Sequence, residues 1–332
     1  MRALGARKYT KMSGLEILDV PVPDIQDPKQ MLIKMHAAGF ATGDANIIAG
    51  KMKTLVGDNF KFPLRAGITG SGIVVKVGKG VTAFKPGDAV YGMAFSRPLK
   101  FNPHPGYASD PSSSGCGSCA NRGSKTGWRA RPYSSRGALS ATGNIGVQML
   151  KHVYGAGRVI STVSTAKMPL VRDRLPPGTV DELIDYQKTP RLADVVTPGS
   201  VDFTYGTQWT LEYIKVMEKR RGVIVSIAAL FPAQLFREVL GDILPFWFLW
   251  VASLAQLYYR WRLRGTSIKM DIVSGNPGVR EDVERVGEIL ATGKIQPVMT
   301  VVEMEDIEAV REAADKVQKI KGGIGGLVIK IA

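Results

Sequence analysis

The most informative segment for the fold of this 332-residue chain is GALSATGNIGVQMLKHVYGAGRVISTVSTAK, residues 137–167. The apolar residues of 146–152 share one face at helical spacing, so a helix is predicted there. The apolar run 158–163 then predicts a buried strand. A glycine-containing turn, a helix and a strand in this order are typical of a unit that binds a dinucleotide.

The turn itself is the segment SATGNIG, residues 140–146. A pyrophosphate binds well at a helix N-terminus, where free N–H groups and the helix dipole attract anions. Gly143 is expected to let the backbone approach the phosphates, and Gly146 to let the helix pack on the sheet. The spacing is not the full GxGxxG pattern, and a glycine at a helix start is often only a turn. The strand that follows is therefore part of the prediction.

The end of that strand distinguishes between two cofactors. A site for NAD usually carries an Asp or Glu there, which binds the ribose 2′-hydroxyl. The stretch 162–167 contains no acid, whereas Ser164, Thr165 and Lys167 can hold a 2′-phosphate through hydroxyl donors and a point charge. NADPH is therefore the predicted cofactor. The alternative is that Lys167 is an ordinary solvated lysine.

The rest of the middle region repeats the alternation of strands and helices. Further strands are predicted at 182–184, 201–204 and 222–228, and a helix at 210–219. Such an alternation implies right-handed crossovers and a parallel sheet, so the predicted fold class is α/β with a doubly wound sheet.

The two ends of the chain differ from this middle region. Residues 1–108 are predicted to be β-rich, with apolar runs separated by turn residues. Residues 271–332 contain amphipathic helices at 280–290 and 306–319 and close with GGLVIKI, a strand that could complete the sheet of the first domain.

The formal net charge of +15 allows a nucleic acid, a membrane surface or an anionic cofactor as partner. The cations are scattered apart from short clusters at 219–221 and 260–264, and no nucleic-acid motif accompanies them, so nucleic acid is disfavoured. Two cysteines exclude a disulfide scaffold, and the N-terminus lacks a secretory pattern. A cytoplasmic protein with a small-molecule substrate is expected.

One run, ILPFWFLWVASLAQLYY at 243–259, carries no charge. Its length lies at the lower edge of the roughly 17–25 residues that cross a bilayer. Pro245 and two polar residues weaken it further. A hydrophobic helix at a substrate pocket or at the contact of a homodimer is the preferred interpretation, and a membrane-associated enzyme is the minority alternative.

These motifs together resemble a known family. The strings AGITGSGIVVKVGKGVTAFKPGDAVYG, VDELIDY, GVIVSIAAL and GGLVIKI, with the glycine turn, are similar to the medium-chain dehydrogenase/reductases. The resemblance is to the zinc-independent branch of quinone oxidoreductases and enoyl reductases, and most to fungal ToxD-like and alcohol dehydrogenase GroES-like members. It covers 1–108 and 137–332.

The resemblance implies a GroES-like catalytic domain built from 1–108 and 271–332, with a Rossmann cofactor domain at 137–270 between them. It implies transfer of a hydride from NADPH to a quinone, an enone or another activated alkene or carbonyl. It also assigns the cofactor contacts. The pyrophosphate would meet Thr142, Gly143, Asn144 and Ile145, in the cofactor-binding turn that also contains Ser140 and Gly146. The 2′-phosphate would meet Ser164, Lys167 and Tyr186. The ribose and nicotinamide would border Tyr205, Gly206, Ser226 and Ala228.

The sequence departs from the zinc-dependent members of this family. They carry Cys-His where this chain has Ala41-Thr42, and His-Glu where it has Ile68-Thr69. A catalytic zinc needs about three protein ligands of the Cys, His or carboxylate kind, so no metal site is predicted. The pair Cys116 and Cys119 lacks the further ligands of a structural zinc site.

Without zinc, hydride transfer needs a held nicotinamide, an electron-poor carbon and a proton source such as water or a hydroxyl. The candidates for the catalytic group are Thr42, Asp44 and Asn46. The equally weighted alternative is a loop whose side chains bond its own backbone.

The segment 109–136 does not fit this pattern. It is rich in Ser, Gly and Arg, and RPYSSR at 131–136 stands where the first strand of the cofactor domain belongs. Two arginines and a proline are not expected in a buried central strand, so an irregular segment is predicted. One hypothesis is that out-of-frame or mis-spliced coding sequence replaces the native linker. Weak cofactor binding, poor stability and a non-catalytic or defective protein would follow.

Overall fold

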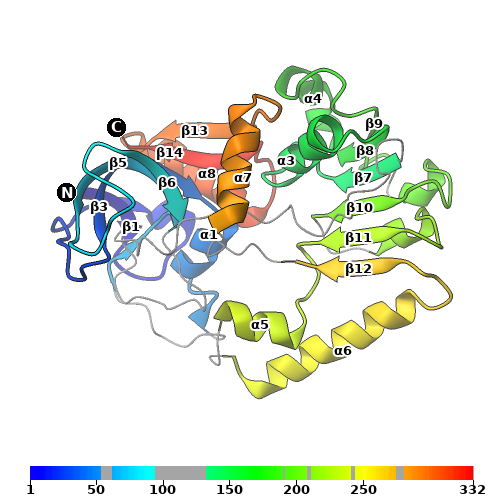
Figure 1. Ribbon diagram of the computed structural model, residues 1–332, viewed down its shortest axis with the longest axis horizontal. Helices are drawn as coiled ribbons and strands as arrows, with labels where there is room; N and C mark the ends of the chain where they lie inside the picture. Colours follow the sequence, from blue (N-terminus) through cyan, green and yellow to red (C-terminus); the bar gives the residue numbers. More distant parts are fainter. Residues whose placement is uncertain are drawn as a thin grey trace.

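The computed structural model describes residues 1–53, 62–93, 132–189, 191–207, 211–240, 244–273 and 280–331. Within them the two ends of the chain form one β-rich domain, and the middle of the chain forms a second domain around a parallel sheet (Figure 1). The predicted α/β fold class is confirmed.

The parallel sheet has six strands in the spatial order β12-β11-β10-β7-β8-β9. In chain order this is 6-5-4-1-2-3, the arrangement of dinucleotide-binding sheets, whose order reverses between β7 and β10. The carboxyl ends of the strands point toward the β-rich domain (Figure 1). The bounds are β7 Pro132–Arg136, β8 Arg158–Val163, β9 Glu182–Asp185, β10 Phe203–Gly206, β11 Val223–Ser226 and β12 Lys269–Ile272.

The strand β7 corrects a prediction. Residues 132–136 were expected to be irregular, but they form the central strand and pair in parallel with both β8 and β10. Pro132 is the first residue of the strand, a position where a missing N–H is tolerated. Arg136 is the last residue, so only Tyr133, Ser134 and Ser135 occupy the interior of the strand. The backbone ladder to two neighbours therefore outweighs the weak strand pattern of the side chains.

Helices cover both faces of this sheet. On one face, α3 (Gly143–Gln148) continues as a π-helical segment at Met149–Val153, and α4 (Met168–Arg174) follows β8. Val147, Leu150 and Val171 bury apolar side chains there. The opposite face is covered by residues of 192–217 and by α6 (Phe246–Arg262).

The predicted helix at 210–219 is wrong in extent, because only a short 3₁₀ helix forms, at Glu212–Lys215. The helix ends at Lys215, and the residues after it pair with Val201, which precedes β10. Val201 donates its N–H to Val216 O at 3.1 Å, and Glu218 donates its N–H to Val201 O at 2.7 Å. Tyr213, Val216 and Met217 are thereby buried in the core.

The β-rich domain contains two sheets, ordered β13-β14-β3-β5-β6 and β2-β1-β4. The closing strand β14 pairs antiparallel with β3 and parallel with β13, which confirms that the C-terminal strand completes the first domain's sheet. The bounds are β1 Arg2–Ala6, β2 Glu16–Asp19, β3 Met31–Phe40, β4 Leu64–Arg65, β5 Thr69–Val77, β6 Ala89–Met93, β13 Met299–Glu303 and β14 Gly326–Lys330.

The described part of this domain also contains α1 (Thr42–Ile48), α7 (Arg280–Ala291) and α8 (Ile307–Lys319). α8 begins where Asp306 caps it by accepting from Ala309 N at 3.0 Å, close to the predicted start. Its residues Val310 and Ala314 pack in the core of the domain.

The uncharged run at 243–259 corresponds to α6, which begins after Pro245 and extends to Arg262. A shorter helix, α5 (Ala233–Leu240), precedes it. Among the described residues, no helix is both long enough and apolar enough to cross a membrane.

Candidate functional site

The predicted cofactor residues lie at the carboxyl ends of β7 to β11, on both sides of the point between β7 and β10 where the strand order reverses. Open α/β sheets bind their ligands at this place, because the loops after the two strands diverge and leave a crevice. Gly137, with φ +76°, turns the chain out of β7, and its N–H donates to Thr162 O at 3.1 Å. A Cβ at Gly137 would lie 3.8 Å from Thr207 Oγ1, so the two strand ends are neighbours.

The glycine turn is held by Ser140. Its Oγ accepts from Gly143 N at 3.0 Å, and its carbonyl accepts from Asn144 N at 3.1 Å. A Cβ at Gly143 would lie 2.1 Å from Gly137 O and 2.6 Å from Ser140 Oγ. Position 143 therefore requires glycine for the turn itself. The sequence pattern indicated only that Gly143 lets the backbone approach the phosphates.

Asn144 joins the turn to the other domain. Its side chain is 1% exposed, and its Nδ2 donates to Ser140 O at 2.8 Å and to Ala141 O at 3.0 Å. Its Oδ1 accepts from Val298 N at 3.0 Å. The Asn144 side chain is thus committed to the protein, and only its backbone could face a phosphate.

Two more contacts extend this junction between the domains. Gln148, fully buried, donates from Nε2 to Gln296 O at 3.0 Å and accepts at Oε1 from Gln296 N at 2.7 Å. Gly325 N donates to Leu139 O at 2.8 Å. The glycine turn is therefore clamped against 296–298 and 325. Sequence reasoning missed these contacts because the partners are about 150 residues apart along the chain.

The start of α3 offers a donor to an anion. Within the described residues, Ile145 N has no acceptor, whereas Asn144 N and Gly146 N donate to Ser140 O and Thr142 O. Thr142 and Ile145 are not fully buried. An unsatisfied N–H at a helix start suits a phosphate oxygen, so this turn fits the predicted pyrophosphate.

Lys167 lies beyond β8 and is half-buried. Its Nζ donates to Gly323 O, and burial lowers the pKa of its ammonium. Among the described residues it forms no ion pair. A desolvated cation without an anionic partner is a good receptor for phosphate. Gly323 belongs to a second glycine-rich stretch, KGGIGG at 321–326, so the structure brings that stretch to the predicted 2′-phosphate position.

Ser164 and Tyr186 stand near Lys167. Ser164 is the residue before the 3₁₀ turn that carries Lys167. Tyr186 donates its N–H to Val163 O at 3.1 Å, and its side chain is exposed. The three residues predicted for the 2′-phosphate therefore lie at the same edge of the sheet.

Asp185 is a neighbour that sequence reasoning missed. Its Oδ2 accepts from Thr165 Oγ1 at 2.6 Å, and its Oδ1 accepts from Gln187 N at 3.0 Å. The Thr165 hydrogen bond is the main cause that lowers the pKa of this carboxyl. The carboxyl ends of adjacent parallel strands share one edge, and that rule applied to the predicted strand 182–184 would have placed an acid here.

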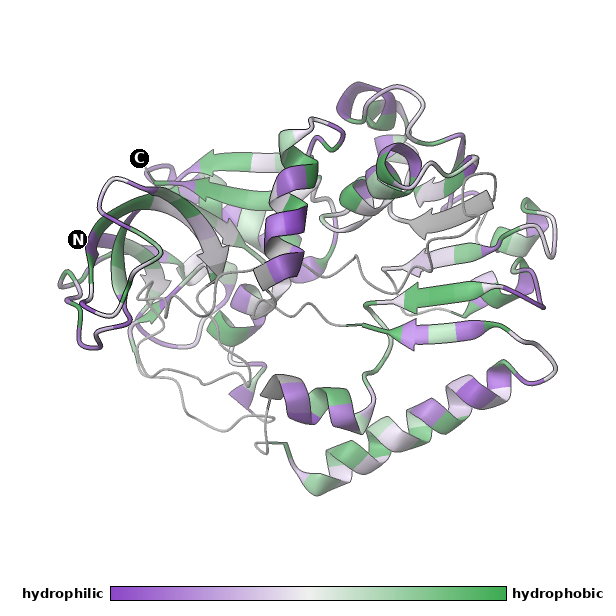
Figure 2. Cartoon of the chain, in the orientation of Figure 1, coloured by the Kyte–Doolittle hydropathy of each residue, from purple (hydrophilic) through white to green (hydrophobic). Residues whose placement is uncertain are grey.

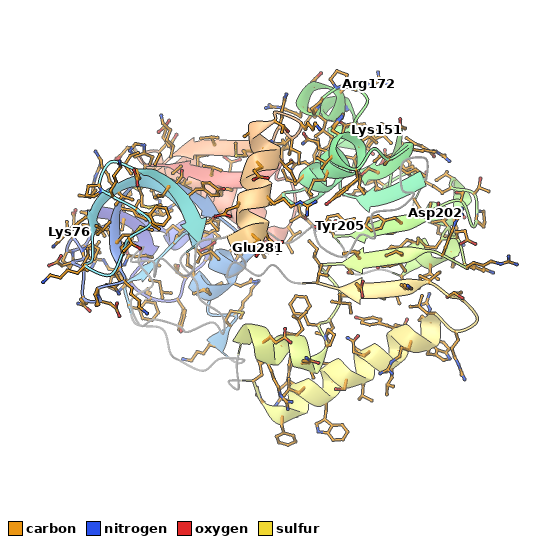
Figure 3. The ribbon with its side chains drawn as sticks, viewed as in Figure 1. Lys76, Lys151, Arg172, Asp202, Tyr205 and Glu281 are labelled. Atoms are coloured by element: carbon orange, nitrogen blue, oxygen red, sulfur yellow. The ribbon has the colours of Figure 1, made fainter. Side chains whose placement is uncertain are left out.

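The residues predicted for the ribose and nicotinamide stand on β10 and β11. Tyr205 lies at the end of β10 that faces the β-rich domain (Figure 3). Ser226, fully buried, accepts at Oγ from Ala228 N at 3.3 Å and from Ala229 N at 3.0 Å. Ser226 therefore shapes the turn after β11, and Gly206 pairs with it across the two strands.

Thr42, Asp44 and Asn46 lie on α1 in the β-rich domain. The Asp44 side chain is 3% exposed; its Oδ2 accepts from Ala41 N at 2.8 Å and its Oδ1 from Gly67 N at 3.0 Å. Burial raises the pKa of Asp44 to about 6, against the effect of these hydrogen bonds. No hydrogen bond among the described residues joins this trio to the glycine turn. Asp44 thus has the backbone-bonding role that was weighed as the alternative, and a catalytic role stays a prediction.

The described residues hold no group of three or more His, Cys, Asp or Glu side chains placed to bind a metal. Ala41-Thr42 and Ile68-Thr69 supply no sulfur, imidazole or carboxylate ligand. Cys116 and Cys119 lie outside the described residues, as does 109–131.

Residues 27–141 match the model of the alcohol dehydrogenase GroES-like domain. Two plant proteins are each 30% identical to this chain: an NADPH-dependent alkenal/one oxidoreductase of Arabidopsis thaliana over 191 residues, and a 2-methylene-furan-3-one reductase of Solanum lycopersicum over 194 residues. The first match covers 49% of this chain and 48% of the relative, and the second 50% and 49%. The chain thus aligns with about half the length of these curated relatives.

Solved structures share the fold over the whole chain. A quinone oxidoreductase from Coxiella burnetii superimposes with a TM-score of 0.70 at 18% identity and covers 100% of this chain and 99% of its own. A mycobacterial protein solved with NADPH superimposes with a TM-score of 0.65 at 18% identity and covers 100% of both chains. At such identities these likenesses establish the fold.

Proposed function

The chain is a medium-chain dehydrogenase/reductase with a GroES-like domain, and on this premise we propose that it uses NADPH to reduce a quinone, an enone or another activated alkene or carbonyl without a catalytic zinc. The observation that carries the proposal is Lys167, a half-buried cation without an ionic partner among the described residues, placed beyond a glycine turn at the switch point of the sheet.

The residues of the site fit the dinucleotide in three places. Ile145 N and the turn 140–146 would hold the pyrophosphate, with Asn144 fixing the turn from behind. Ser164, Lys167 and Tyr186 would surround the 2′-phosphate. The ends of β10 and β11 would border the ribose and nicotinamide. When bound, the cofactor supplies the hydride, while these residues hold its ring at the crevice between the domains.

NADPH is proposed over NADH because of two charged side chains near the 2′ position, the Lys167 ammonium and the Asp185 carboxylate. The Lys167 ammonium has no anion beside it, and a charge-assisted hydrogen bond to a phosphate contributes about 1.5–3 kcal/mol. The competing charge, the Asp185 carboxylate, already accepts from Thr165 Oγ1 and Gln187 N. It is thereby less available to a ribose hydroxyl. The preference for NADPH should be about 10- to 100-fold.

The substrate class follows from the missing zinc ligands and from the relatives. With no Lewis acid to polarise an alcohol or carbonyl, the acceptor must itself be electron-poor, as in an enone or a quinone. The names of the two plant relatives specify an alkenal or alkenone and a 2-methylene-furan-3-one. Hydride adds to the electron-poor carbon, and a proton from water or a hydroxyl completes the reduction.

The proposed roles of the α1 trio differ from one another. Asp44 is a positioning residue, because both its oxygens hold backbone N–H groups of Ala41 and Gly67. Thr42, half-buried at the start of α1, is the proposed hydroxyl donor, and Asn46 the second candidate.

A spectrophotometric assay of NADPH oxidation tests this function. The acceptor panel should contain a 2-alkenal, a cyclic enone and a benzoquinone, each with and without a chelator. We expect turnover of at least one acceptor, unaffected by the chelator. Loss of turnover on chelation would contradict the zinc-free reaction. Tight NADPH binding without turnover of any acceptor would favour the non-catalytic alternative.

A further inference from the structure

The helix α6 has one face packed on the cofactor domain. Ala252 is fully buried and Tyr259 nearly so. Tyr259 OH accepts from Leu230 N at 3.1 Å, and Gln256 Nε2 donates to Leu230 O at 2.8 Å. These contacts fix the rotation of the helix, so the identity of its outward face is settled.

The outward face is a stripe of large apolar side chains, each between 54% and 76% exposed. We call these residues the aromatic stripe: Phe246, Trp247, Trp250, Leu254, Leu257 and Trp261. At about 100° per residue they fall within one arc of about 100°. Together they present roughly 700 Å² of apolar surface, above the roughly 300–600 Å² of the largest patch on a typical monomer.

A cluster of cations lies at the C-terminal end of the stripe. Ser267 N donates to Lys219 O at 2.7 Å, which brings the loop before β11 against the loop after α6. Figure 2 shows apolar residues along α6 and hydrophilic residues at its C-terminal end. We call these residues the basic corner: Lys219, Arg220, Arg221, Arg260, Arg262 and Arg264.

The basic corner is only partly neutralised by nearby acids. Arg221 pairs with Asp202 at 3.2 Å and with Glu218 at 3.8 Å. Among the described residues no acid pairs with Arg260 or Arg264. On the helical wheel, Arg260 and Arg262 flank the aromatic stripe on its two sides. Interfacial helices use this arrangement, because the cations reach lipid headgroups while the apolar residues enter the acyl boundary.

We propose that the aromatic stripe and the basic corner form a docking surface for an anionic lipid bilayer. α6 would lie in the interface plane, with its tryptophans at headgroup depth, where Trp is enriched. A second copy of the chain fits less well, because α6 carries no acid between 246 and 262 to meet the basic corner. The net charge of +15 on each copy also opposes their pairing and favours an anionic surface.

Co-sedimentation with phosphatidylcholine vesicles, with and without phosphatidylserine, tests the proposal on the full chain. We expect binding to the phosphatidylserine vesicles that weakens as salt is added. The corner variant replaces Arg220, Arg260 and Arg264 by Gln, and should bind about 100-fold more weakly at low salt, since each cation contributes about fivefold. The control variant replaces Lys29, Lys79 and Lys85 by Gln and should bind as the parent does.

The stripe variant, Trp250→Ser with Trp261→Ser, should lose more than about tenfold in binding. Both side chains are exposed, so thermal unfolding of this variant should match that of the parent, which separates lost docking from lost folding. Equal binding by the corner and control variants would overturn the proposal. So would a dimer in analytical ultracentrifugation that the stripe variant abolishes, without vesicle binding by the parent.

Discussion

Replacement of Asn144 by alanine is the sharpest test of how the glycine turn is held. The Asn144 side chain carries three hydrogen bonds of 2.8–3.0 Å, to Ser140 O, Ala141 O and Val298 N, and is 1% exposed. Because all three lie behind the turn, Asn144→Ala should weaken both the fold and the cofactor site.

The magnitude follows from what the truncation leaves behind. The buried N–H of Val298 loses its acceptor, which costs about 1–3 kcal/mol. Ser140 O still accepts from Asn144 N, and Ala141 is exposed to water, so each of the two lost donor bonds costs only about 0.5–1 kcal/mol. The sum is a destabilisation of about 3 kcal/mol.

The assay is urea unfolding followed by far-ultraviolet circular dichroism, together with an NADPH titration at low urea. Asn144→Asp is the matched control, because it retains an oxygen for Val298 N while removing both donors. It places a carboxylate against the carbonyls of Ser140 and Ala141, so it should retain the domain junction and still disturb the turn.

A loss below about 1 kcal/mol in Asn144→Ala would refute the reasoning, since it would mean that Val298 N finds another acceptor or that the junction opens without cost. Unchanged NADPH affinity in a clearly destabilised variant would show that the turn does not form part of the cofactor site. That result would contradict the expectation that Asn144→Ala weakens NADPH binding.

Three further predictions follow from single contacts. Gly143→Ala should abolish NADPH binding, because its Cβ would lie 2.1 Å from Gly137 O, whereas Gly326→Ala, with nothing within 4 Å, should leave binding intact in the same titration. Gly325→Ala should destabilise the fold in urea by about 2 kcal/mol, because φ is +66° and the Cβ would meet Val298 O at 1.8 Å. The raised pKa of Asp44, about 6 against 3.8 in the unfolded chain, means that the folded state holds this proton more tightly, so its contribution to stability is full below pH 4 and is lost as pH rises through 6. The unfolding free energy of the parent relative to Asp44→Asn should therefore fall by about 2 kcal/mol between these pH values, and a flat difference would contradict the assignment.

The sequence predicts those parts of the fold where pattern and packing agree. The strand at 158–163 occurs with the predicted bounds, because its run of apolar residues is buried. The glycine turn could also be predicted, because it depends on residues that are close together in the sequence. The closing strand could be predicted from its apolar run, although the sequence does not identify β3 as its neighbour.

The features that the sequence did not predict depend on contacts between distant segments. β7 forms from PYSSR at 132–136 because β8 and β10 hydrogen-bond to it on both sides, and the residues of the strand do not themselves indicate those neighbours. The Thr165–Asp185 pair joins two strand ends, and the Asn144–Val298 bond joins two domains. The helix predicted at 210–219 does not form over its predicted length for the same reason, because hydrogen bonds to Val201 compete with helical hydrogen bonds.

The most direct test of the central claim is isothermal titration of the chain with NADPH and NADH, repeated on Lys167→Gln. We expect NADPH to bind about 10- to 100-fold more tightly than NADH, and the variant to lose this preference while it retains its NADH affinity. Equal affinities in the parent, or a preference for NADPH that survives in Lys167→Gln, would contradict it.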